Sequence, residues 1–281
     1  MRTLVLQMDD RLEGDTALLQ PSPDAQIRLT FTRHNRTVAQ GRGCAYQFQP
    51  GGHQEKPPWW RKVFAMRDVF SNDPEPHELL VLWMDSDAML TDCGSLDPSG
   101  LATRYPKNCM WISPDAPPAQ SGFNAGSFLV RGTNAGRALL WEWCSKYNPH
   151  TWVRRRQSER PTVSVREGLE KQGLDQPLWW QNTVGGWAGP AFEQGSFAES
   201  FLPAADRYGI VIMPYYVFNE VDCKRPHQHS ITVHLYGSHA SRKCSLPHLP
   251  CVYRAVHWKP VIWFVSGWIR PKKNTSSVSL Y

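Results

Sequence analysis

An apolar run that stops at two carboxylates constrains this chain more than any other feature of its sequence. Residues 79–84 are Leu-Leu-Val-Leu-Trp-Met, and Asp85 and Asp87 follow directly. Consecutive large apolar residues are typical of a strand buried on both faces in a parallel sheet. A buried carboxylate is costly unless it is paired or bound to a metal. The pattern therefore predicts that Asp85 and Asp87 lie in a crevice at the carboxyl end of this strand.

Two carboxylates at such a strand end favour a hard cation, Mn²⁺ or Mg²⁺, because these ions prefer oxygen ligands. A cation of this kind commonly binds a diphosphate, and nucleotide-sugar transferases use this arrangement. The same spacing also fits a solvated Asp-Ser-Asp turn in which Asp87 caps the next helix.

The elements around the acidic pair predict an α/β layer fold. Strands are expected over residues 3–8, 45–48 and 79–84, and helices over 24–42 and 59–71. This β-α-β-α-β order, with the acidic pair after the third strand, is typical of α/β architecture.

The second half of the chain is less regular. Asn124-Ala125-Gly126 leads directly into a strand that ends near Arg131, and glycine permits either close backbone approach to a ligand or an unusual φ. The further expectations are a helix over 132–146, a loop or variable insertion over 147–172, a helical stretch over 174–180, strands over 210–218 and 231–236, and a loose tail.

Composition limits the partners. The 281 residues carry a net charge of +6, and the only dense basic run is Arg-Arg-Arg at 154–156, which argues against nucleic acid. A modest positive balance suits an anionic substrate such as a nucleoside diphosphate. The thirteen tryptophans and nine tyrosines include candidates for platforms on which sugar rings stack.

Localisation signals are sparse. The sequence has no apolar window long enough to span a membrane and no signal-peptide core, so we expect a soluble, cytoplasmic chain without membrane association. A trimmed N-terminal anchor would place it in the Golgi lumen instead. The sequons at Asn35 and Asn274 favour the secretory route weakly. Residues 261–268 are apolar and suit either core or a membrane surface.

Seven scattered cysteines do not form a dense disulfide framework. One or two bridges are compatible with the sequence, especially among Cys223, Cys244 and Cys251. A structural Zn²⁺ site is an alternative, although the spacing matches no standard pattern. Its candidate ligands are Cys223, His227, His229, His239, Cys244, His248 and Cys251.

Six stretches together resemble one family: the plant xyloglucan α-1,6-xylosyltransferases, the galactomannan α-1,6-galactosyltransferases and the related fungal α-mannosyltransferases. They occur in the family's order within residues 57–240. The matching stretches lie at 60–67, 82–92, 123–131, 174–176, 213–219 and 232–237, and Trp-Met-Asp-Ser-Asp-Ala-Met at 83–89 is the most specific.

The resemblance implies a single catalytic GT-A domain over residues 1–281, with a Rossmann-like mixed sheet flanked by helices. A nucleotide-sugar half would cover about 1–130, an acceptor and metal-completing half about 131–260, and a loose tail 261–281. It also implies a nucleotide-sugar donor, a divalent cation that is usually Mn²⁺, and retention of the α configuration.

By the same resemblance, Asp85, Asp87 and His234 would bind the metal, and Ser86 would lie near the nucleotide. The donor would also be contacted by Lys62, Asn124, Ala125, Gly126 and Gly237, with a phosphate contact from His239 or Lys243. Asp175 and Gln176 match the pair beneath the reacting carbon, although one carboxylate of the family's Asp-Asp-Gln string is replaced by Leu174 here.

Plainer roles exist for several of these residues. Lys62 also suits a solvated helix position, His234 an ordinary hydrogen-bonded strand end, and Asp175 a helix cap. In a transfer reaction the metal acts as a Lewis acid on the leaving diphosphate. Asp175 would act as a nucleophile or support the ring cation, and the sequence leaves front-face attack and double displacement open.

These observations predict a metal-dependent retaining glycosyltransferase that moves xylose or galactose from a UDP-sugar to a carbohydrate acceptor. A GDP-mannose-dependent mannosyltransferase is one alternative. A non-catalytic carbohydrate-binding protein on a transferase scaffold is another, and a two-carboxylate glycosidase is a third.

Overall fold

The structure is a computed structural model that describes residues 1–9, 23–91, 98–117, 122–156, 178–184, 189–221 and 226–234. Its strands are β1 (Arg2–Met8), β2 (Ala45–Gln49), β3 (Leu79–Asp85), β4 (Ala88–Leu90), β5 (Met110–Ile112), β6 (Ser127–Arg131), β7 (Trp152–Arg156), β8 (Leu178–Asn182), β9 (Ile210–Ile212) and β10 (Thr232–His234). Its α-helices are α2 (Pro23–Gly41), α3 (Pro58–Asn72), α4 (Pro98–Arg104), α5 (Asn134–Ser145), α7 (Glu193–Phe201) and α8 (Tyr215–Phe218), and its 3₁₀ turns are η2 (Pro76–Glu78), η3 (Pro149–Thr151) and η5 (Leu202–Ala204).

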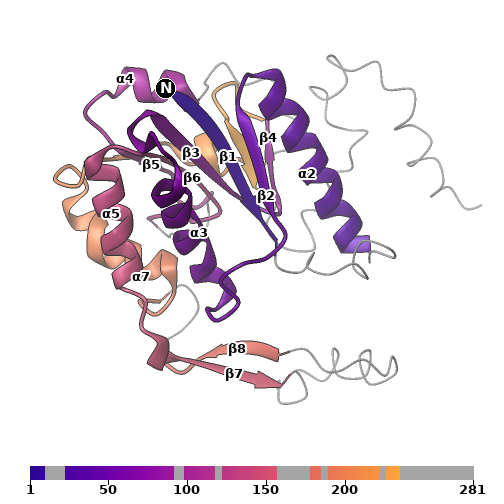
Figure 1. The fold of residues 1–281 in the computed structure, drawn as a ribbon, viewed down its shortest axis with the longest axis vertical. Helices are drawn as coiled ribbons and strands as arrows, with labels where there is room; N and C mark the ends of the chain where they lie inside the picture. The colour runs from indigo at the N-terminus through magenta and orange to yellow at the C-terminus, as the bar shows by residue number, and fades with distance from the viewer. Residues whose placement is uncertain are drawn as a thin grey trace, which may run out of the picture.

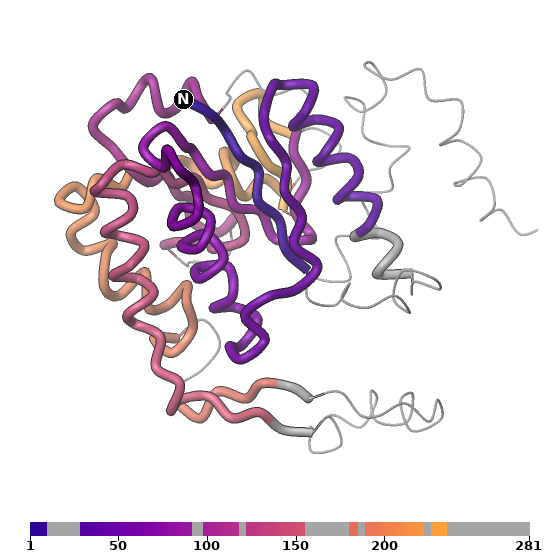
Figure 2. Tube along the Cα trace, in the orientation of Figure 1, coloured from indigo at the N-terminus to yellow at the C-terminus, as the bar shows by residue number. Residues whose placement is uncertain are grey.

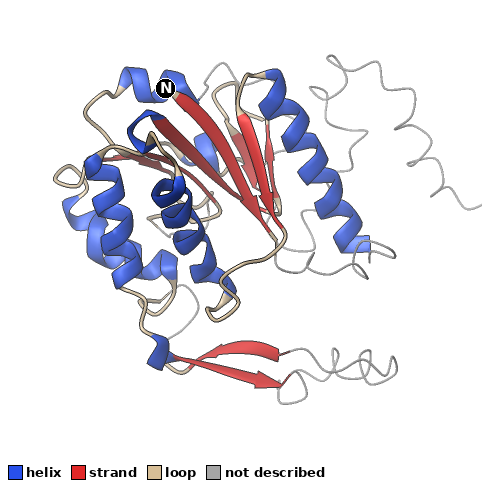
Figure 3. Cartoon of the chain, viewed as in Figure 1, coloured by secondary structure: helices blue, strands red, loops and turns tan. Residues whose placement is uncertain are grey.

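A six-stranded sheet in the order β2-β1-β3-β6-β5-β9 forms the centre of the fold, with helices on both sides (Figures 1 and 3). Strand β6 runs antiparallel to β3 and β5, and the other neighbouring pairs are parallel. The sheet is therefore mixed, as the α/β GT-A prediction requires.

Strand β3 is buried on both faces, which explains its unbroken apolar sequence. Leu79, Val81 and Trp83 belong to the core beneath α3, α5 and α7. Leu80, Leu82 and Met84 belong to a second core shared with α2, α4 and α8. Asp85 continues the first alternation, so its side chain is on the α3 side of the sheet.

The prediction of a parallel environment for β3 is correct on one edge only. Strand β3 pairs parallel with β1 and antiparallel with β6. An apolar run indicates burial on both faces but does not indicate strand direction, so it could not predict the antiparallel partner.

Three predicted helices are confirmed. Residues 24–42, 59–71 and 132–146 correspond to α2, α3 and α5. Pro58 occupies the first turn of α3, where its missing N–H costs nothing. Thr133 caps α5 by accepting a hydrogen bond from the Gly136 amide at 3.3 Å.

The expectation of a loop over 147–172 is wrong at 152–156, and that of a helical stretch over 174–180 is wrong at 178–180. Residues 152–156 form β7 and residues 178–182 form β8, an antiparallel pair apart from the central sheet (Figure 2). The Arg154 guanidinium lies 5.9 Å from the centre of the Trp180 ring across this pair. Cross-strand aromatic contacts of this kind favour a strand over a helix.

The predicted strand over 210–218 is also shorter than expected. Strand β9 ends at Ile212, and α8 begins after Pro214, whose extended backbone precedes the helix. Strand β10 lies within the predicted 231–236.

Several other sequence features are now placed. Asn35 is fully buried, so the first sequon is inaccessible in the folded protein, and Asn274 lies outside the described residues. Cys44, Cys109 and Cys144 are free thiols, whereas Cys223, Cys244, Cys251 and residues 261–281 lie outside the described part. Within the described ranges, no helix has the length and apolar character needed to cross a bilayer.

Gly132, at the end of β6, provides a test of the packing. A Cβ there would lie 1.7 Å from the Pro76 carbonyl oxygen, a backbone atom that cannot rotate away. We expect Gly132→Ala to lower the free energy of unfolding by about 1–3 kcal/mol in urea titrations. Gly41→Ala is the matched control, since a Cβ at Gly41 meets nothing within 4 Å. Equal stability of the two variants would contradict this packing.

Candidate active site

Asp85 and Asp87 lie at the carboxyl end of β3, on a tight turn that leads into β4. The Asp85 amide donates a hydrogen bond to the Gly126 carbonyl at 2.7 Å, which holds the turn against the segment before β6. A strand follows Asp87, so the interpretation of Asp87 as a helix cap is wrong. The acidic pair lies at the carboxyl end of β3, as the apolar run predicted.

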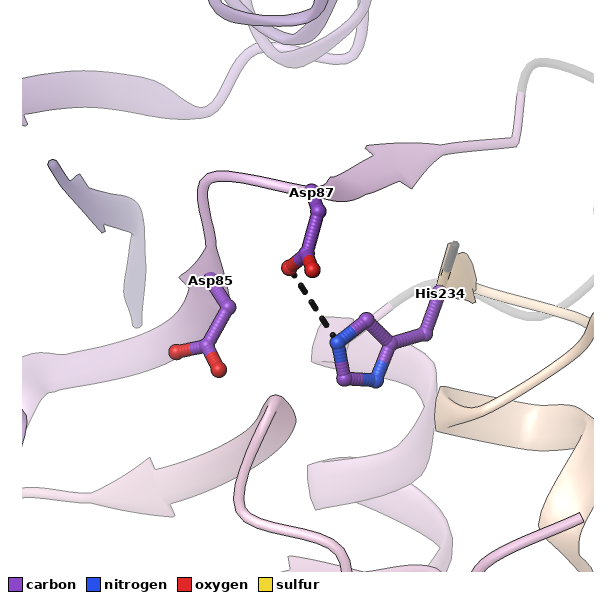
Figure 4. A group of neighbouring side chains, drawn as sticks. All are labelled: Asp85, Asp87 and His234. Carbon is purple, nitrogen blue, oxygen red and sulfur yellow. Dashed lines mark ion pairs between the residues drawn. The ribbon is translucent and has the colours of Figure 1, made fainter. Parts of the chain in front are cut away.

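His234 reaches the acidic pair because β10 pairs antiparallel with β4. The register places His234 opposite Ala88, the residue after Asp87. Its Nε2 lies 3.3 Å from Asp87 Oδ1 (Figure 4). One ligand atom from each of Asp85, Asp87 and His234 lies within 4.8 Å of the others. Residues from two distant parts of the sequence thus converge on one point.

Gly126 makes room for the His234 ring. A Cβ at this position would lie 1.9 Å from His234 Cε1, inside the ring's own volume. Of the two reasons left open for a glycine here, an unusual φ does not apply, since Gly126 is not among the described glycines with positive φ. The glycine is needed for close approach of a side chain.

Lys62 is an internal charge of the site and not a solvated helix lysine. Its Nζ lies 2.9 Å from Asp85 Oδ1 and donates to the Ala125 carbonyl at 3.0 Å. Burial alone lowers the pKa of Lys62, but the carboxylates of Asp85 and Glu193 raise it above its ordinary value. The lysine therefore stays charged beside the acidic pair. Trp83 holds the same carboxylate, donating from Nε1 to Asp85 Oδ1 at 2.8 Å.

Glu193 and Gln194, at the start of α7, belong to this site, and the sequence analysis missed them. Glu193 Oε1 lies 3.4 Å from Lys62 Nζ, and Gln194 Oε1 accepts a hydrogen bond from the Ala125 amide at 3.0 Å. Glu193 Oε2 is buried without a hydrogen-bond partner among the described residues. Burial raises the pKa of Glu193, and the Lys62 ammonium offsets only part of that rise.

A sequence signal for this pair did exist. Glu193-Gln194 directly precedes a stretch with Phe197 and Phe201 at helical spacing, so an acidic-amide pair at the start of an amphipathic helix was recognisable.

The segment before β6 lines the same site. Asn124 is buried, its Oδ1 accepts from the Gly126 amide at 2.8 Å, and its Nδ2 donates to Asp115. Ser86, between the two aspartates, is buried as well. The predicted residues Asp175, Gln176, Gly237, His239 and Lys243 lie outside the described residues.

The residues present fit a manganese-type ion. Two carboxylates and one imidazole are a ligand set that Mn²⁺ accepts more readily than Mg²⁺. Burial lowers the pKa of His234, whereas the nearby Asp87 carboxylate raises it, and the net shift is upward. Among the described residues this is the one group with the composition and spacing of a metal site.

Comparison with solved structures finds chains that are similar to this one. The chain aligns with the crystal structure of a glycosyltransferase involved in the glycosylation of the major capsid of PBCV-1. The TM-score is 0.53 at 13% identity, over 86% of this chain and 100% of that chain. A Drosophila β-1,4-galactosyltransferase 7 in complex with manganese, UDP-Gal and xylobiose aligns at a TM-score of 0.37 and 11% identity, over 85% of this chain and 73% of that chain.

No family model and no curated protein matches the sequence. The likeness to this glycosyltransferase shows the fold alone, which is the α/β GT-A fold.

Gly126→Ala tests the packing that places His234. We expect the added methyl group to displace the imidazole and to weaken Mn²⁺ binding, measured by electron paramagnetic resonance in the presence of UDP. Gly122→Ala is a nearby control, since its Cβ would meet the end of the flexible Leu202 side chain at 3.1 Å. Wild-type Mn²⁺ affinity in Gly126→Ala would show that the His234 ring does not depend on this gap.

Proposed function

We propose that this protein is a metal-dependent retaining glycosyltransferase that moves a sugar, xylose or galactose, from a UDP-sugar to a carbohydrate acceptor. The observation that carries the proposal is the convergence of Asp85, Asp87 and His234 at the carboxyl edge of a GT-A sheet. A lectin or a glycosidase binds no nucleoside diphosphate and so needs no metal site for one, whereas a nucleotide-sugar transferase does.

During the reaction, negative charge develops on the leaving diphosphate and positive charge develops on the sugar ring. The bond from the anomeric carbon to the phosphate oxygen breaks, a bond from the acceptor oxygen to that carbon forms, and the acceptor proton leaves with the diphosphate. Asp85, Asp87 and His234 would hold Mn²⁺, or Mg²⁺, and the bound ion supplies Lewis-acid stabilisation of the diphosphate.

Lys62 is suited to stabilise the negative charge that develops on the diphosphate. Its ammonium is fixed between Asp85, Glu193 and the Ala125 carbonyl. The charge is therefore already in place and does not have to move during the reaction. Preorganised charge of this kind is often the largest contribution to catalysis. His239 and Lys243 remain candidates for a second phosphate contact.

Glu193 and Gln194 are suited to stabilise the positive charge that develops on the sugar ring. Glu193 Oε2 is buried and has no hydrogen-bond partner within the described ranges, so a bound hydroxyl or a ring cation would satisfy it, and leaving it unsatisfied is costly. Gln194 is tied to the backbone of the segment that carries Asn124. We therefore propose Glu193-Gln194 beside Asp175-Gln176 as candidates for the pair at the reacting carbon.

The donor is tested by a thermal-shift panel of UDP-sugars and GDP-mannose with and without Mn²⁺, because a ligand that binds only the native state raises the melting temperature. We expect UDP-xylose or UDP-galactose with Mn²⁺ to give the largest shift. A larger shift with GDP-mannose would favour the mannosyltransferase alternative. A carbohydrate-binding protein would respond to oligosaccharides and to neither nucleotide sugar.

Asp87→Ala should abolish both Mn²⁺-dependent UDP binding and turnover, since it removes a carboxylate ligand that no neighbour replaces. Isothermal titration with UDP and Mn²⁺ measures the first effect. Asp206→Ala, an exposed turn position outside the site, is the control. Wild-type nucleotide affinity in Asp87→Ala would refute the metal assignment.

Glu193→Gln keeps the size of the side chain and removes its charge. We expect nearly intact donor binding and a fall in kcat of at least about 100-fold, typical for loss of one preorganised electrostatic group. Glu199→Gln, exposed on the same helix, is the matched control. Asp175→Asn, measured in parallel, shows which of the two pairs acts. An unchanged kcat in Glu193→Gln removes Glu193 from the mechanism.

A further inference from the structure

Side chains from the α2 region make hydrogen bonds to the outer edge of β4. Strand β4 is short, and among the described strands it pairs with β10 along one edge only. On its other edge, where a neighbouring strand would ordinarily lie, its backbone is bonded by His34 and Asn35, and Arg42 bonds the next residue, Thr91; we call these three residues the β4 clamp. Edge strands normally leave such groups to water.

Asn35 is the centre of the β4 clamp. It is fully buried, its Nδ2 donates to the Ala88 carbonyl at 2.9 Å, and its Oδ1 accepts from the Leu90 amide at 2.8 Å. Ala88 O and Leu90 N point to the same side of a strand, so one side-chain amide replaces the peptide of a missing neighbour. A carboxamide has both the donor and the acceptor that this position requires.

The other two members extend the same contact along the strand. A His34 ring nitrogen lies 2.9 Å from the Leu90 carbonyl, and Arg42 Nη2 donates to the Thr91 carbonyl at 2.6 Å. The β4 clamp therefore fixes β4 over its whole length and for one residue beyond it.

The opposite end of the acidic turn is held by the same network. Gln7, on β1, donates from Nε2 to the Asp85 carbonyl at 2.9 Å. Its Oε1 accepts from Asn35 at 3.2 Å and from the Tyr46 hydroxyl at 2.7 Å. The carbonyls of Asp85 and Ala88 bracket the Asp-Ser-Asp turn, and a buried amide holds each of them.

We infer that the β4 clamp, with Asn35 at its centre, positions the metal site, an inference that rests on the proposed function. None of its three residues belongs to the metal group itself. Asn35 instead fixes the strand that carries Asp87 at its start and that aligns His234 through β10. Residues that orient metal ligands typically change metal affinity about 10–100-fold when they are removed.

The decisive variant is Asn35→Ala. We expect the dissociation constant of Mn²⁺ in the presence of UDP, followed by electron paramagnetic resonance, to rise at least about ten-fold. In the metal-free protein, the Leu90 amide should exchange its hydrogen faster with solvent, because its acceptor is lost. This second readout requires neither metal nor turnover.

Val38→Ala is the matched control on the same helix. Val38 is a buried core residue, so the substitution lowers stability without removing a hydrogen bond to β4. We expect its Mn²⁺ affinity and its Leu90 exchange to remain at the wild-type level. An equal loss of Mn²⁺ affinity in Val38→Ala would show that general destabilisation causes the effect and would overturn the inference.

If Asn35→Ala does not fold, Arg42→Ala provides the test instead. Arg42 is only partly buried, and its loss removes one bond at the far end of β4, so a smaller rise in the same dissociation constant is expected. Wild-type Mn²⁺ affinity in the folded variants, with a wild-type protein that does bind Mn²⁺ and UDP, overturns the inference. A wild-type protein that binds neither overturns the proposed function itself.

Discussion

The ion pair between Lys62 and Asp85 is the interaction on which the site depends. Strand β3 is buried on both faces, so its last residue brings a carboxylate to the edge of a dry core. The Lys62 side chain is buried, so its ammonium needs carboxylates beside it, because an uncompensated buried charge is costly. Lys62 also joins Asp85 to Glu193, which lies more than a hundred residues further along the chain. The Lys62 ammonium thus forms ion pairs with two carboxylates, those of Asp85 and Glu193.

The site is built from three layers of support. The central sheet provides the edge, the buried amides of Gln7 and Asn35 hold the turn, and Gly126 leaves the space into which the His234 ring fits. Each layer is rigid for a different reason: backbone pairing, saturated hydrogen bonding and steric exclusion. A site supported in this way is preorganised, which is the condition for strong electrostatic stabilisation of developing charge.

The N-terminal half of the fold could be predicted from the sequence because its elements are long and strongly patterned. The run at 79–84 and the amphipathic stretch at 59–71 identified β3 and α3 with little error. The β7–β8 pair was missed because cross-strand contacts between Arg154 and Trp180 stabilise it, and such contacts join residues far apart in sequence. The start of α7 was recognisable from the spacing of Phe197 and Phe201, but the role of Glu193 comes from its ion pair with Lys62, which the local sequence does not show.

The position of His234 has a consequence for assembly of the site. The two carboxylates are contributed by the first third of the chain and the imidazole by a strand near residue 234, so the full ligand set exists only once β10 has docked on β4. An ion held by all three residues would link these two distant segments of the chain. Its binding energy would then add to the stability of the whole domain, and metal uptake would report that the polypeptide has completed its tertiary structure.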